Sequence, residues 1–459
     1  MIVKLTPLQN EIDAILLEGP KPVQDLYSAI IITPEERIQP LRLLSIDIER
    51  NYLEQFADEM IIELFMPKGA FLFDVVPFKE ELLIELTREP LAEGHEELEG
   101  DEADVEVREY RAFIQGEESQ LVESDAERMQ TRMDANHEPF YKVSFQLVSK
   151  AVEQLRIMQT GGIYRNEIPG DVVRYVLTHA SDQLDLPEGE GIAGVDRVEW
   201  DNENTHPQIV IPHGTPLQDV ADLIQTDWGG VYNTGIGCYL QDQLWYLWPE
   251  FNTERFEEEE RVVQIFNIPP ELYPGIERTW RMDEYQLIIL STGETKHFDA
   301  SQPRQLNEGN GARYSHTDPL WAGQNEYSKN VGESTKDNKF KIKRSEHNSE
   351  HVLKERKDYN VVPIVNDRQS NNSFAQTSKI ANRLGGFISV SWEYSKHDYI
   401  YPGMPARFFY LKDDELKQAD GVVVKTQHYI HDPKQGPAER QFHCNSVLTL
   451  FLKAQEDSQ

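Results

Sequence analysis

Short apolar runs of strand length, separated by turn residues, constrain the fold of this chain most. Near the N-terminus, Ser45–Arg50 alternates polar and apolar residues, and Met60–Met66 and Leu82–Leu86 are apolar runs. Proline and glycine separate the runs at Pro67–Gly69 and at Pro77. Alternation with period two and runs of about four to eight residues are typical of β-strands. The pattern therefore predicts a small antiparallel barrel or sandwich at this end of the chain.

The C-terminal part shows the same pattern, interrupted by a polar segment at about 300–373 that is dense in Asn, Ser, Lys and Glu. We expect this segment to be an insertion or an extended arm with local helix; its Lys336–Lys357 stretch is basic in an otherwise acidic chain. A helix is predicted at Ser373–Leu384. The apolar runs predict a second barrel with strands at Val262–Phe266, Leu287–Leu290, Phe387–Tyr394, Ala406–Leu411, Gly421–Ile430 and Ser446–Lys453.

The middle of the chain mixes helical and strand patterns. Apolar residues recur at helical spacing over Tyr141–Met158, and an acidic residue after Pro169-Gly170 suits the first turn of a helix over Asp171–Leu184. A shorter helix is expected at Pro216–Gln225. Strands are expected at Gln208–Ile211 and at the aromatic run Leu244–Trp248.

The predicted fold class is thus mixed and predominantly β (α+β), with two small antiparallel β-barrel domains, an intervening α/β region and a long polar insertion. The predicted boundaries are 1–138 for the first barrel, 139–255 for the α/β domain and 256–459 for the second barrel. An acidic excursion at about 93–128 lies in the first domain, as a hairpin or a mobile loop; runs of charge of this kind usually form a solvated face.

Charge and composition exclude several classes of protein. The chain has 45 basic and 80 acidic residues, a net charge of −35, so a surface that grips nucleic acid is not expected. No apolar run approaches the roughly 18 residues of a membrane span, and the first residues lack the pattern of a signal peptide. Cys238 and Cys444 are the two cysteines, too few for a disulfide framework, and we expect both to be small buried groups.

Known catalytic motifs are missing from the sequence. Gly235-Ile236-Gly237 lacks the third glycine of a dinucleotide fingerprint and predicts a tight turn. A cluster at the C-terminal end hints at a metal, but its spacing matches no standard zinc pattern and its first histidine falls in a predicted strand: His428, His431, His443 and Cys444. We therefore predict a chain that is not an enzyme, with no catalytic residues, no metal and no cofactor.

A group of aromatic residues in the middle region is the remaining candidate for specific binding. Aromatic side chains dominate interface hot spots, and they also fill cores, so core packing and a subunit interface are both open for this group. Its members are Trp228, Tyr232, Tyr239, Trp245, Tyr246 and Trp248.

Three segments of the sequence, in this order, resemble the baseplate hub proteins of contractile-tailed bacteriophages. The first is Leu44–Leu86, with its strands and Pro-rich corner. The second runs from Gly229 to Tyr239 and continues at Trp245–Pro249. The third is Tyr399–Tyr410, with Pro402-Gly403 leading into a strand, followed by Asp420–Tyr429. Pro-Gly turns between alternating strands suit closed antiparallel sheets.

The resemblance implies a structural virion protein, present in the tail baseplate and assembled in the host cytoplasm. It implies a homotrimer whose two barrels per subunit form a ring of six similar domains, joining a sixfold tail tube to a threefold spike and passing DNA through its lumen without specific binding. Expected partners are the spike, tube and baseplate wedge proteins, with the tape measure protein as a further candidate. Two alternatives remain open: a tail-associated cell-wall hydrolase, and a distal-tail or receptor-facing adaptor.

Overall fold

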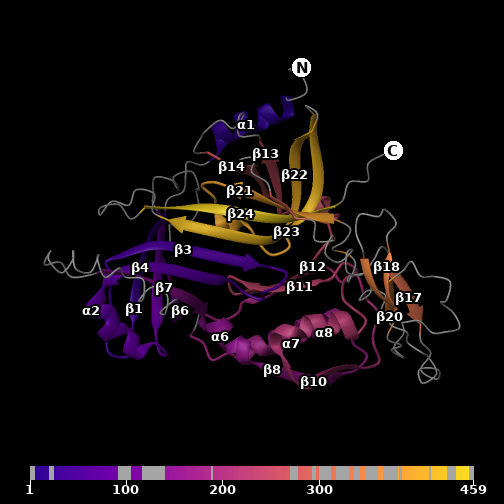
Figure 1. Cartoon of the computed structure of the whole chain (residues 1–459), viewed down its shortest axis with the longest axis horizontal. Coiled ribbons are helices and arrows are strands. Elements are labelled where there is room, and N and C mark those ends of the chain that lie inside the picture. Colours follow the sequence, from indigo (N-terminus) through magenta and orange to yellow (C-terminus); the bar gives the residue numbers. More distant parts are fainter. Residues whose placement is uncertain are drawn as a thin grey trace.

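The computed structural model describes most of the chain, and strands dominate it (Figure 1). The described residues are 6–19, 25–90, 105–115, 140–187, 190–268, 278–291, 296–298, 312–316, 330–334, 342–346, 360–364, 381, 385–412, 415–431 and 441–453. One large mixed sheet runs through the molecule, and helices gather beside it, so the fold is mixed α+β and mostly strands, as the sequence predicts.

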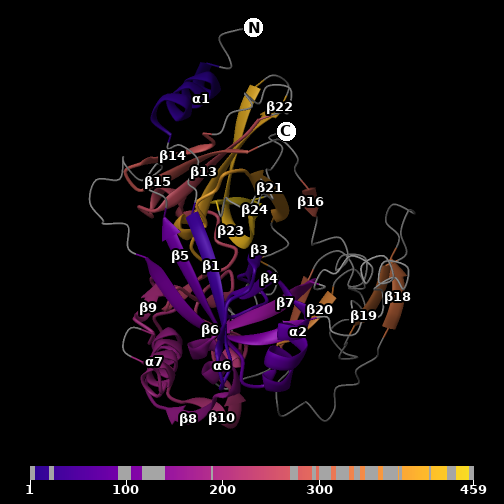
Figure 2. The ribbon, with the colours of Figure 1, turned by 90° about the vertical axis from the view of Figure 1, so that its left-hand side faces the viewer.

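Eight strands of the large sheet close into a ring of hydrogen-bonded neighbours, which we call the first β-unit. β24 completes it by pairing with both β23 and β1. Figure 2 shows β1, β5 and β6 of this unit crossing the centre of the molecule. In ring order the strands are β1 (Asp25–Ile32), β5 (Leu83–Pro90), β6 (Glu106–Gln115), β7 (Phe140–Ser149), β4 (Glu59–Pro67), β3 (Arg42–Asn51), β23 (Glu415–His431) and β24 (Gln441–Lys453).

The inside of the first β-unit is a packed apolar core. Burial alternates along β1, as period two requires, and Ile31, Ile62, Ile84 and Phe145 point inward and are fully buried. Short helical turns after β4 pack against the same core, and β2 (Arg37–Ile38) pairs with β1. The turns are α2 (Lys68–Ala70), η2 (Phe71–Val75) and η3 (Val76–Phe78).

The remaining strands of the large sheet, together with β23 and β24, form the second β-unit. Its core contains Trp392, Ile265, Phe408 and Leu450. The sheet order is β14 (Trp280–Asp283), β15 (Gln286–Ser291), β13 (Val262–Asn267), β22 (Pro405–Lys412), β23, β24, β21 (Gly385–Trp392) and β16 (Lys296–Phe298).

The expectation of purely antiparallel pairing is wrong for this unit, because β13 runs parallel to both of its neighbours, β15 and β22. Strand direction depends on the connection between strands, and only a tight hairpin forces antiparallel pairing. β22 follows β13 after a long stretch of chain that includes the polar segment. The apolar runs predicted both strands without revealing their direction.

The β23–β24 hairpin belongs to both β-units. β23 has 17 residues, and its first part pairs with β22 whereas its last part pairs with β3. The register shifts between Val423 and Lys425, which leaves Val424 as an extra residue in β23. A bulge of this kind re-aims the residues after it. Val423 therefore faces the second core, and Ile430 faces the first.

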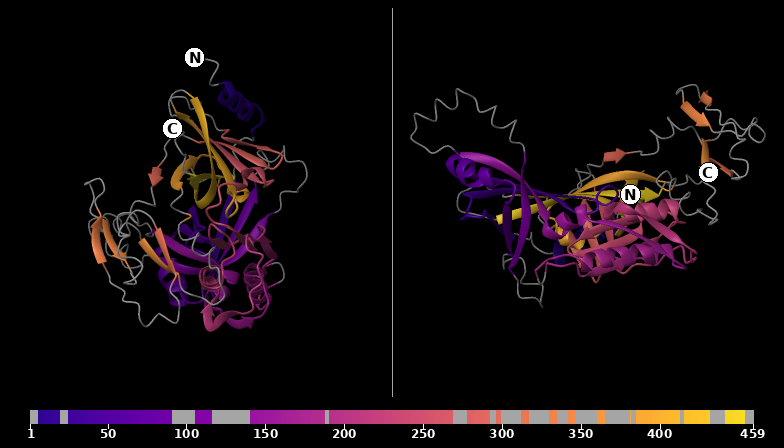
Figure 3. Two further views of the ribbon diagram at one scale, coloured as in Figure 1. Left: turned by 90° about the vertical axis from the view of Figure 1, so that its right-hand side faces the viewer. Right: turned by 90° about the horizontal axis from the view of Figure 1, so that it is seen from below.

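The middle region lies beneath the β-units and has its own core (Figure 3). Two small sheets, β8–β10 and β9–β12–β11, pack against its three helices. The elements are α6 (Lys150–Ile157), β8 (Gln159–Tyr164), α7 (Pro169–Asp182), β9 (Gly194–Arg197), β10 (Ile209–Pro216), η4 (Leu217–Asp219), α8 (Val220–Asp227), β11 (Ile236–Gln241), β12 (Leu244–Pro249) and η5 (Arg255–Glu257).

The predicted helix at Tyr141–Met158 is wrong over its first half. Residues 140–149 form β7, which pairs with β4 and β6, and the helix α6 begins only at Lys150. The Ser149 hydroxyl accepts a hydrogen bond from the Val152 N–H at 3.2 Å and caps this helix. Val143, Phe145 and Leu147 also alternate with the period of a β-strand. Hydrogen bonding to β4 on one side and to β6 on the other favours the strand over the helix here. The other predicted helices and strands of the middle region are confirmed.

An N-terminal helix, α1 (Thr6–Glu18), was not expected. Its residues Leu8, Ile12 and Ile15 recur at helical spacing and pack on β13 and β15 of the second β-unit. The Arg278 Nη1 donates hydrogen bonds to the carbonyl oxygens of Leu16 and Leu17 at the end of the helix, at 2.9 and 3.2 Å. These contacts satisfy terminal carbonyl groups.

The polar segment contributes two short strand pairs where it is described. β17 (Ala312–His316) pairs with β20 (Asn360–Ile364), and β18 (Asn330–Ser334) pairs with β19 (Ile342–Glu346).

The predicted helix at Ser373–Leu384 lies outside the described residues except for Ala381. The middle of the acidic excursion is β6, the sixth strand in sequence, and so part of the sheet. Within the described parts, no helix is long and apolar enough to cross a membrane.

Candidate functional site

The predicted aromatic group divides between the core and the surface. Tyr232, Tyr239, Trp245 and Trp248 are at most 2% exposed and lie in the cores of the chain itself. The Tyr232 hydroxyl donates to the Val198 carbonyl, and the Trp245 indole donates to the Ser181 hydroxyl. Trp228 and Tyr246 are partly buried, so these two keep surface that a partner could contact.

The C-terminal histidines and cysteine do not meet at one point. His428 lies within β23, as expected, and Cys444 is its near neighbour across the hairpin, but His431 and His443 pair further along the strands. No group of three or more His, Cys, Asp or Glu side chains able to hold a metal occurs in the described parts of the chain. Cys238 and Cys444 are both free, and burial raises their pKa to about 12 and about 11.

The turn predicted at Gly235-Ile236-Gly237 is only partly correct, because Ile236 and Gly237 are the first residues of β11. Gly235 has φ +110° directly before β11, and Gly403 has φ +68° two residues before β22. Backbone angles of this kind are open to glycine at little cost. The Pro402-Gly403 turn thus leads into a strand, as the sequence indicates.

Where the two β-units and the middle region meet, charged side chains gather; Asp25, Arg50 and His397 are buried, and the others are partly buried or exposed. We call this set the charged junction. It was not identified from the sequence, because its members lie far apart along the chain and single Arg and Asp residues carry no signal in an acidic protein. Its members are Asp25, Arg50, Asp58, Arg88, Glu106, Arg108, Asp242, His397 and Asp398.

Arg50 is the centre of one half of the charged junction. Its side chain is 3% exposed, and Nε donates to Asp58 Oδ2 at 2.9 Å. The Tyr239 hydroxyl of the middle region donates to the other oxygen of Asp58 at 3.0 Å. Burial raises the pKa of Asp58, and the adjacent guanidinium of Arg50 opposes that rise. This cluster joins β3 of the first β-unit to β11.

Arg88 is the centre of the other half. Its Nε donates to Asp25 at 2.7 Å, and Nη2 lies 2.8 Å from Asp398, which belongs to η7 (His397–Tyr399) of the second β-unit. His397 Nε2 lies 3.0 Å from the other oxygen of Asp398. Burial alone raises the pKa of Asp398, but His397, Arg88 and Lys396 together hold it well below its usual value. Burial lowers the pKa of His397 to about 4, so its ring is neutral at pH 7.

A polar strip on the β23–β24 hairpin lies next to these charges. His428 is fully buried, and its Nδ1 lies 2.6 Å from the Ser446 hydroxyl, which in turn lies 2.6 Å from the Ser395 hydroxyl. The His397 and His428 rings have centroids 5.4 Å apart. Burial, then the nearby charge of Arg50, lowers the pKa of His428 well below its usual value. The serine–histidine contact is sealed from solvent, so a substrate cannot reach it.

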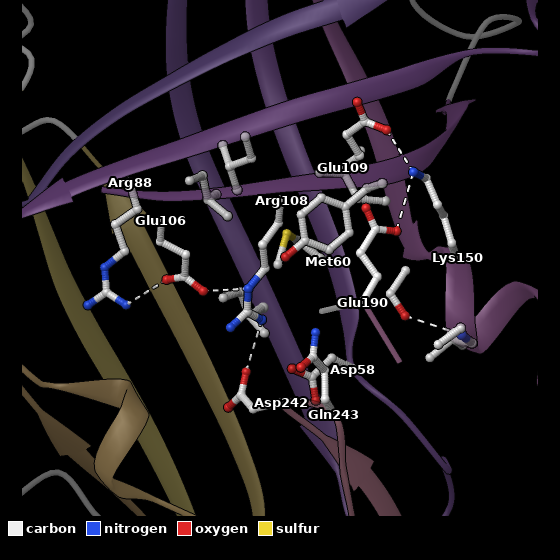
Figure 4. Close-up of a pocket in the computed structure, with 18 of the residues that line it drawn as sticks. Asp58, Met60, Arg88, Glu106, Arg108, Glu109, Lys150, Glu190, Asp242 and Gln243 are labelled. Carbon is white, nitrogen blue, oxygen red and sulfur yellow. Dashed lines mark hydrogen bonds and ion pairs between the residues drawn. The ribbon is translucent and has the colours of Figure 1, made fainter. Parts of the chain in front are cut away.

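A cavity of about 310 Å³ opens beside the charged junction, at the end of the first β-unit that faces the middle region (Figure 4). Arg108 reaches between Glu106 and Asp242, and Nη1 lies 3.2 Å from Asp242. Lys150 lies 2.7 Å from Glu109 and 3.4 Å from Glu190. Although burial raises the pKa of Asp242, Arg50 and Arg108 lower it below its usual value. The arrangement can hold three parts of the chain together and can take a small ligand.

Comparisons with known proteins give matches among solved structures. No family model matches the chain, and no curated protein matches it. The tail protein of Neisseria meningitidis MC58 is similar over 93% of this chain and 96% of its own, with 9% identity and a TM-score of 0.45. The 43 kDa tail protein of prophage MuSo2 from Shewanella oneidensis is similar over 92% and 97%, with 9% identity and a TM-score of 0.45.

A PdpA–VgrG complex of Francisella is similar over 98% of this chain and 61% of its own, with 9% identity and a TM-score of 0.41. These similarities extend along nearly the whole length of this chain, to two solved tail proteins, one of them from a prophage, and to a VgrG complex.

Proposed function

We propose that this chain is a structural virion protein, the central hub of a contractile-tail baseplate, and that it acts as a homotrimer without catalysis. The observation that carries the proposal is the β23–β24 hairpin, whose two strands run through both β-units. Three chains with two β-units each would present six similar positions to a sixfold tail tube, and keep threefold symmetry for a spike. Such an adaptor requires the first and second β-units of each subunit to keep a fixed orientation relative to each other.

Covalent continuity and burial both support a fixed angle. Two long strands cross the boundary without a linker. The charged junction adds the Arg88–Asp398 pair between the first and second β-units, and the Arg108–Asp242 pair between the first β-unit and the middle region. A buried ion pair is costly to break, because the partner left behind is a desolvated charge. Bending between the first and second β-units would break the Arg88–Asp398 pair, whose arginine side chain is largely shielded from solvent. The subunit is therefore suited to transmitting force between a tube and a spike.

The proposed path for DNA lies between subunits and not within one. The interior of the first β-unit is filled by side chains such as Phe145 and Ile62. A lumen on the trimer axis would be lined by an acidic protein of net charge −35. Like charge repels phosphate, so DNA would pass without being held. Native gels at low salt should then show no shift of duplex DNA.

The proposed partners are the spike, tail tube and baseplate wedge proteins, with the tape measure protein as a further candidate; the setting is the virion tail. Among the residues considered for interfaces, Trp228 and Tyr246 retain partly exposed rings. Tyr246 stacks on Tyr401 with ring centroids 6.0 Å apart. Aromatic side chains that are held in place lose little entropy on contact with a partner.

Mass in solution tests the proposal. Three chains of 53.1 kDa give a trimer of about 159 kDa, which we expect by sedimentation or native mass spectrometry, alone or after addition of spike protein. A monomer that persists at high concentration with spike present would contradict the hub. A stable hexamer would favour the distal-tail adaptor. Clearing of a peptidoglycan suspension by the pure protein, abolished by substitution of one carboxylate, would favour the hydrolase.

A further inference from the structure

The cavity beside the charged junction has an apolar floor. We call it the mouth cavity, and it measures about 310 Å³. Most of its floor belongs to the core of the first β-unit, but Met60 and Tyr110 are only partly buried there, and Ile192 of the middle region also keeps accessible surface. An occupant that covers this apolar surface removes it from water, which favours binding. The apolar lining residues are Tyr27, Ile46, Ile48, Met60, Leu86, Tyr110, Leu147, Ile192 and Ile430.

Two pairs of carboxylates on the rim of the mouth cavity each share a single cation. All four carboxylate side chains are between 32% and 43% exposed, so a ligand in the cavity can reach them. Each pair has two negative charges and one positive charge, which leaves one negative charge over. As the dashed lines in Figure 4 show, Glu106 and Asp242 share Arg108, and Glu109 and Glu190 share Lys150.

The remaining charges around the mouth cavity cancel. Three carboxylates meet three cations there: Asp25, Asp58 and Asp398 against Arg50, Arg88 and Lys396. His397 also lines the cavity, and with a pKa of about 4 it is neutral at pH 7. The surplus is therefore two negative charges, and both belong to the accessible pairs on the rim.

This surplus selects the charge of an occupant. An anion would be repelled, and a neutral molecule would gain nothing from the surplus. A cation gains Coulomb attraction, which is stronger in a partly desolvated space than in bulk water. The N–H groups of an ammonium also donate to carboxylate oxygens, which are acceptors only when ionised. The rim thus favours an ammonium group, and the floor favours an apolar chain.

We propose that the mouth cavity binds a small organic ammonium ion, whose positive head contacts the rim carboxylates and whose short apolar chain covers Met60 and Tyr110. Primary alkylamines of about six carbons are the simplest members of this class, since an alkyl amine of the lysine type is protonated at neutral pH. The cavity lies within one subunit, so the proposal does not depend on the hub function.

Four probes test this chemistry on the full-length protein: hexylamine, hexanamide, hexanoate and ethylamine, each titrated at pH 7 in a calorimeter. Hexylamine should bind saturably at one site per chain. Hexanamide and hexanoate lack the positive charge and should bind more weakly by a factor of about ten or more. Ethylamine leaves the floor uncovered and should also bind more weakly by a factor of about ten or more.

The ethylamine titration is needed because a chain of net charge −35 attracts every cation weakly. Binding of ethylamine as tight as that of hexylamine would overturn the proposal, because the floor would then contribute nothing. Equal or tighter binding of hexanamide or hexanoate would overturn it as well, since the rim would then not select a cation. A lack of saturable hexylamine binding would have the same consequence.

Two double variants test the role of the rim. Glu190→Gln combined with Asp242→Asn takes one carboxylate from each pair and removes the surplus, so hexylamine binding should weaken by a factor of about ten or more. Glu258→Gln combined with Glu260→Gln changes the net charge of the protein equally, at two exposed residues that do not line the mouth cavity, and should leave binding unchanged. Equal effects of the two double variants would contradict the proposed role of the rim.

A change in the floor locates the chain of the ligand. Met60→Trp fills the floor and should abolish hexylamine binding, whereas Met282→Trp, at a position that is 41% exposed on β14, should leave binding unchanged. Unchanged binding in Met60→Trp would refute the assignment to this cavity. Should Met60→Trp fail to fold, the rim variants still decide, because their side chains are accessible to solvent.

Discussion

His428 on β23 and Ser446 on β24 face each other at 2.6 Å, at the point where the β23–β24 hairpin leaves one core and enters the other. On the same face of the hairpin, Val423 and Leu450 lie in the core of the second β-unit, and Ile430 and Cys444 lie in the core of the first. The polar pair thus marks the boundary between the two units. Apolar residues there would merge the two cores, whereas a satisfied polar contact specifies one register of the hairpin.

The buried histidines should make stability depend on pH. His397 has a pKa of about 4 in the folded chain, against about 6.5 in an unfolded one, so below pH 6.5 the unfolded chain binds more protons. Its contribution to stability is therefore complete above pH 6.5 and is lost as the pH falls toward 4. The free energy of unfolding in urea should fall by about 3 kcal/mol between pH 7 and pH 4 from this group.

His397→Gln keeps a donor for Asp398 but cannot be protonated, so its unfolding free energy should depend less on pH over this range. The exposed His213→Gln is the matched control and should leave the pH dependence as in the wild type. Equal pH dependence in all three proteins would show that His397 does not titrate as described.

The ion pair between Arg50 and Asp58 should contribute far more to stability than a surface pair on the same strands. Arg50→Met leaves Asp58 without its buried cationic partner, and we expect a loss of about 3 to 5 kcal/mol in the free energy of unfolding. Lys425→Met removes a more exposed pair with Glu49, which also joins β23 to β3, and should cost about 1 kcal/mol or less. Equal losses in the two variants would contradict the burial argument.

Gly403 should not tolerate a side chain. Its φ of +68° disfavours other residues, and a Cβ at this position would overlap the indole ring of the buried Trp248. Gly403→Ala should lower the free energy of unfolding by about 2 to 4 kcal/mol. Gly191→Ala is the control, because no atom lies within 4 Å of a Cβ there. Thermal unfolding followed by circular dichroism would measure both, and a stable G403A protein would show that the turn can shift.

Substitution of the adjacent residues Trp245 and Tyr246 should distinguish a role in core packing from a role in subunit contact. Trp245 is 1% exposed, so Trp245→Ala should cost about 3 to 5 kcal/mol in unfolding free energy. Tyr246→Ala should weaken subunit association, measured by sedimentation over a range of concentrations, and should cost less stability than Trp245→Ala because Tyr246 is only partly buried. Tyr175→Ala on α7, at a residue that is 57% exposed, is the control. Unchanged association in Tyr246→Ala would remove this residue from the proposed interface.

Part of the fold could be predicted from the sequence, because many of its strands coincide with apolar runs, although β6 in the acidic excursion does not. Strands within β3, β4, β21 and β23, the helix α7 and the turn at Gly403 follow from period, length and turn chemistry, which are local properties. The prediction for residues 141–149 was wrong because the sequence fits both structures. Val143, Leu147 and Val148 have helical spacing, whereas Val143, Phe145 and Leu147 alternate as in a strand. Pairing with β4 and β6 chose the strand.

The sequence by itself determined the acidic character, the dominance of strands and the alternation that gives strands such as β1 and β4 one buried face. Only the tertiary structure decided that β13 lies parallel to its neighbours, that β23 and β24 serve two units, and that Arg50, Asp58 and Tyr239 meet. The physical reason is that side-chain period is set by neighbours along the chain, whereas strand order and a buried ion pair depend on residues as distant as Asp58 and Tyr239. Their contact exists only once the sheets have packed.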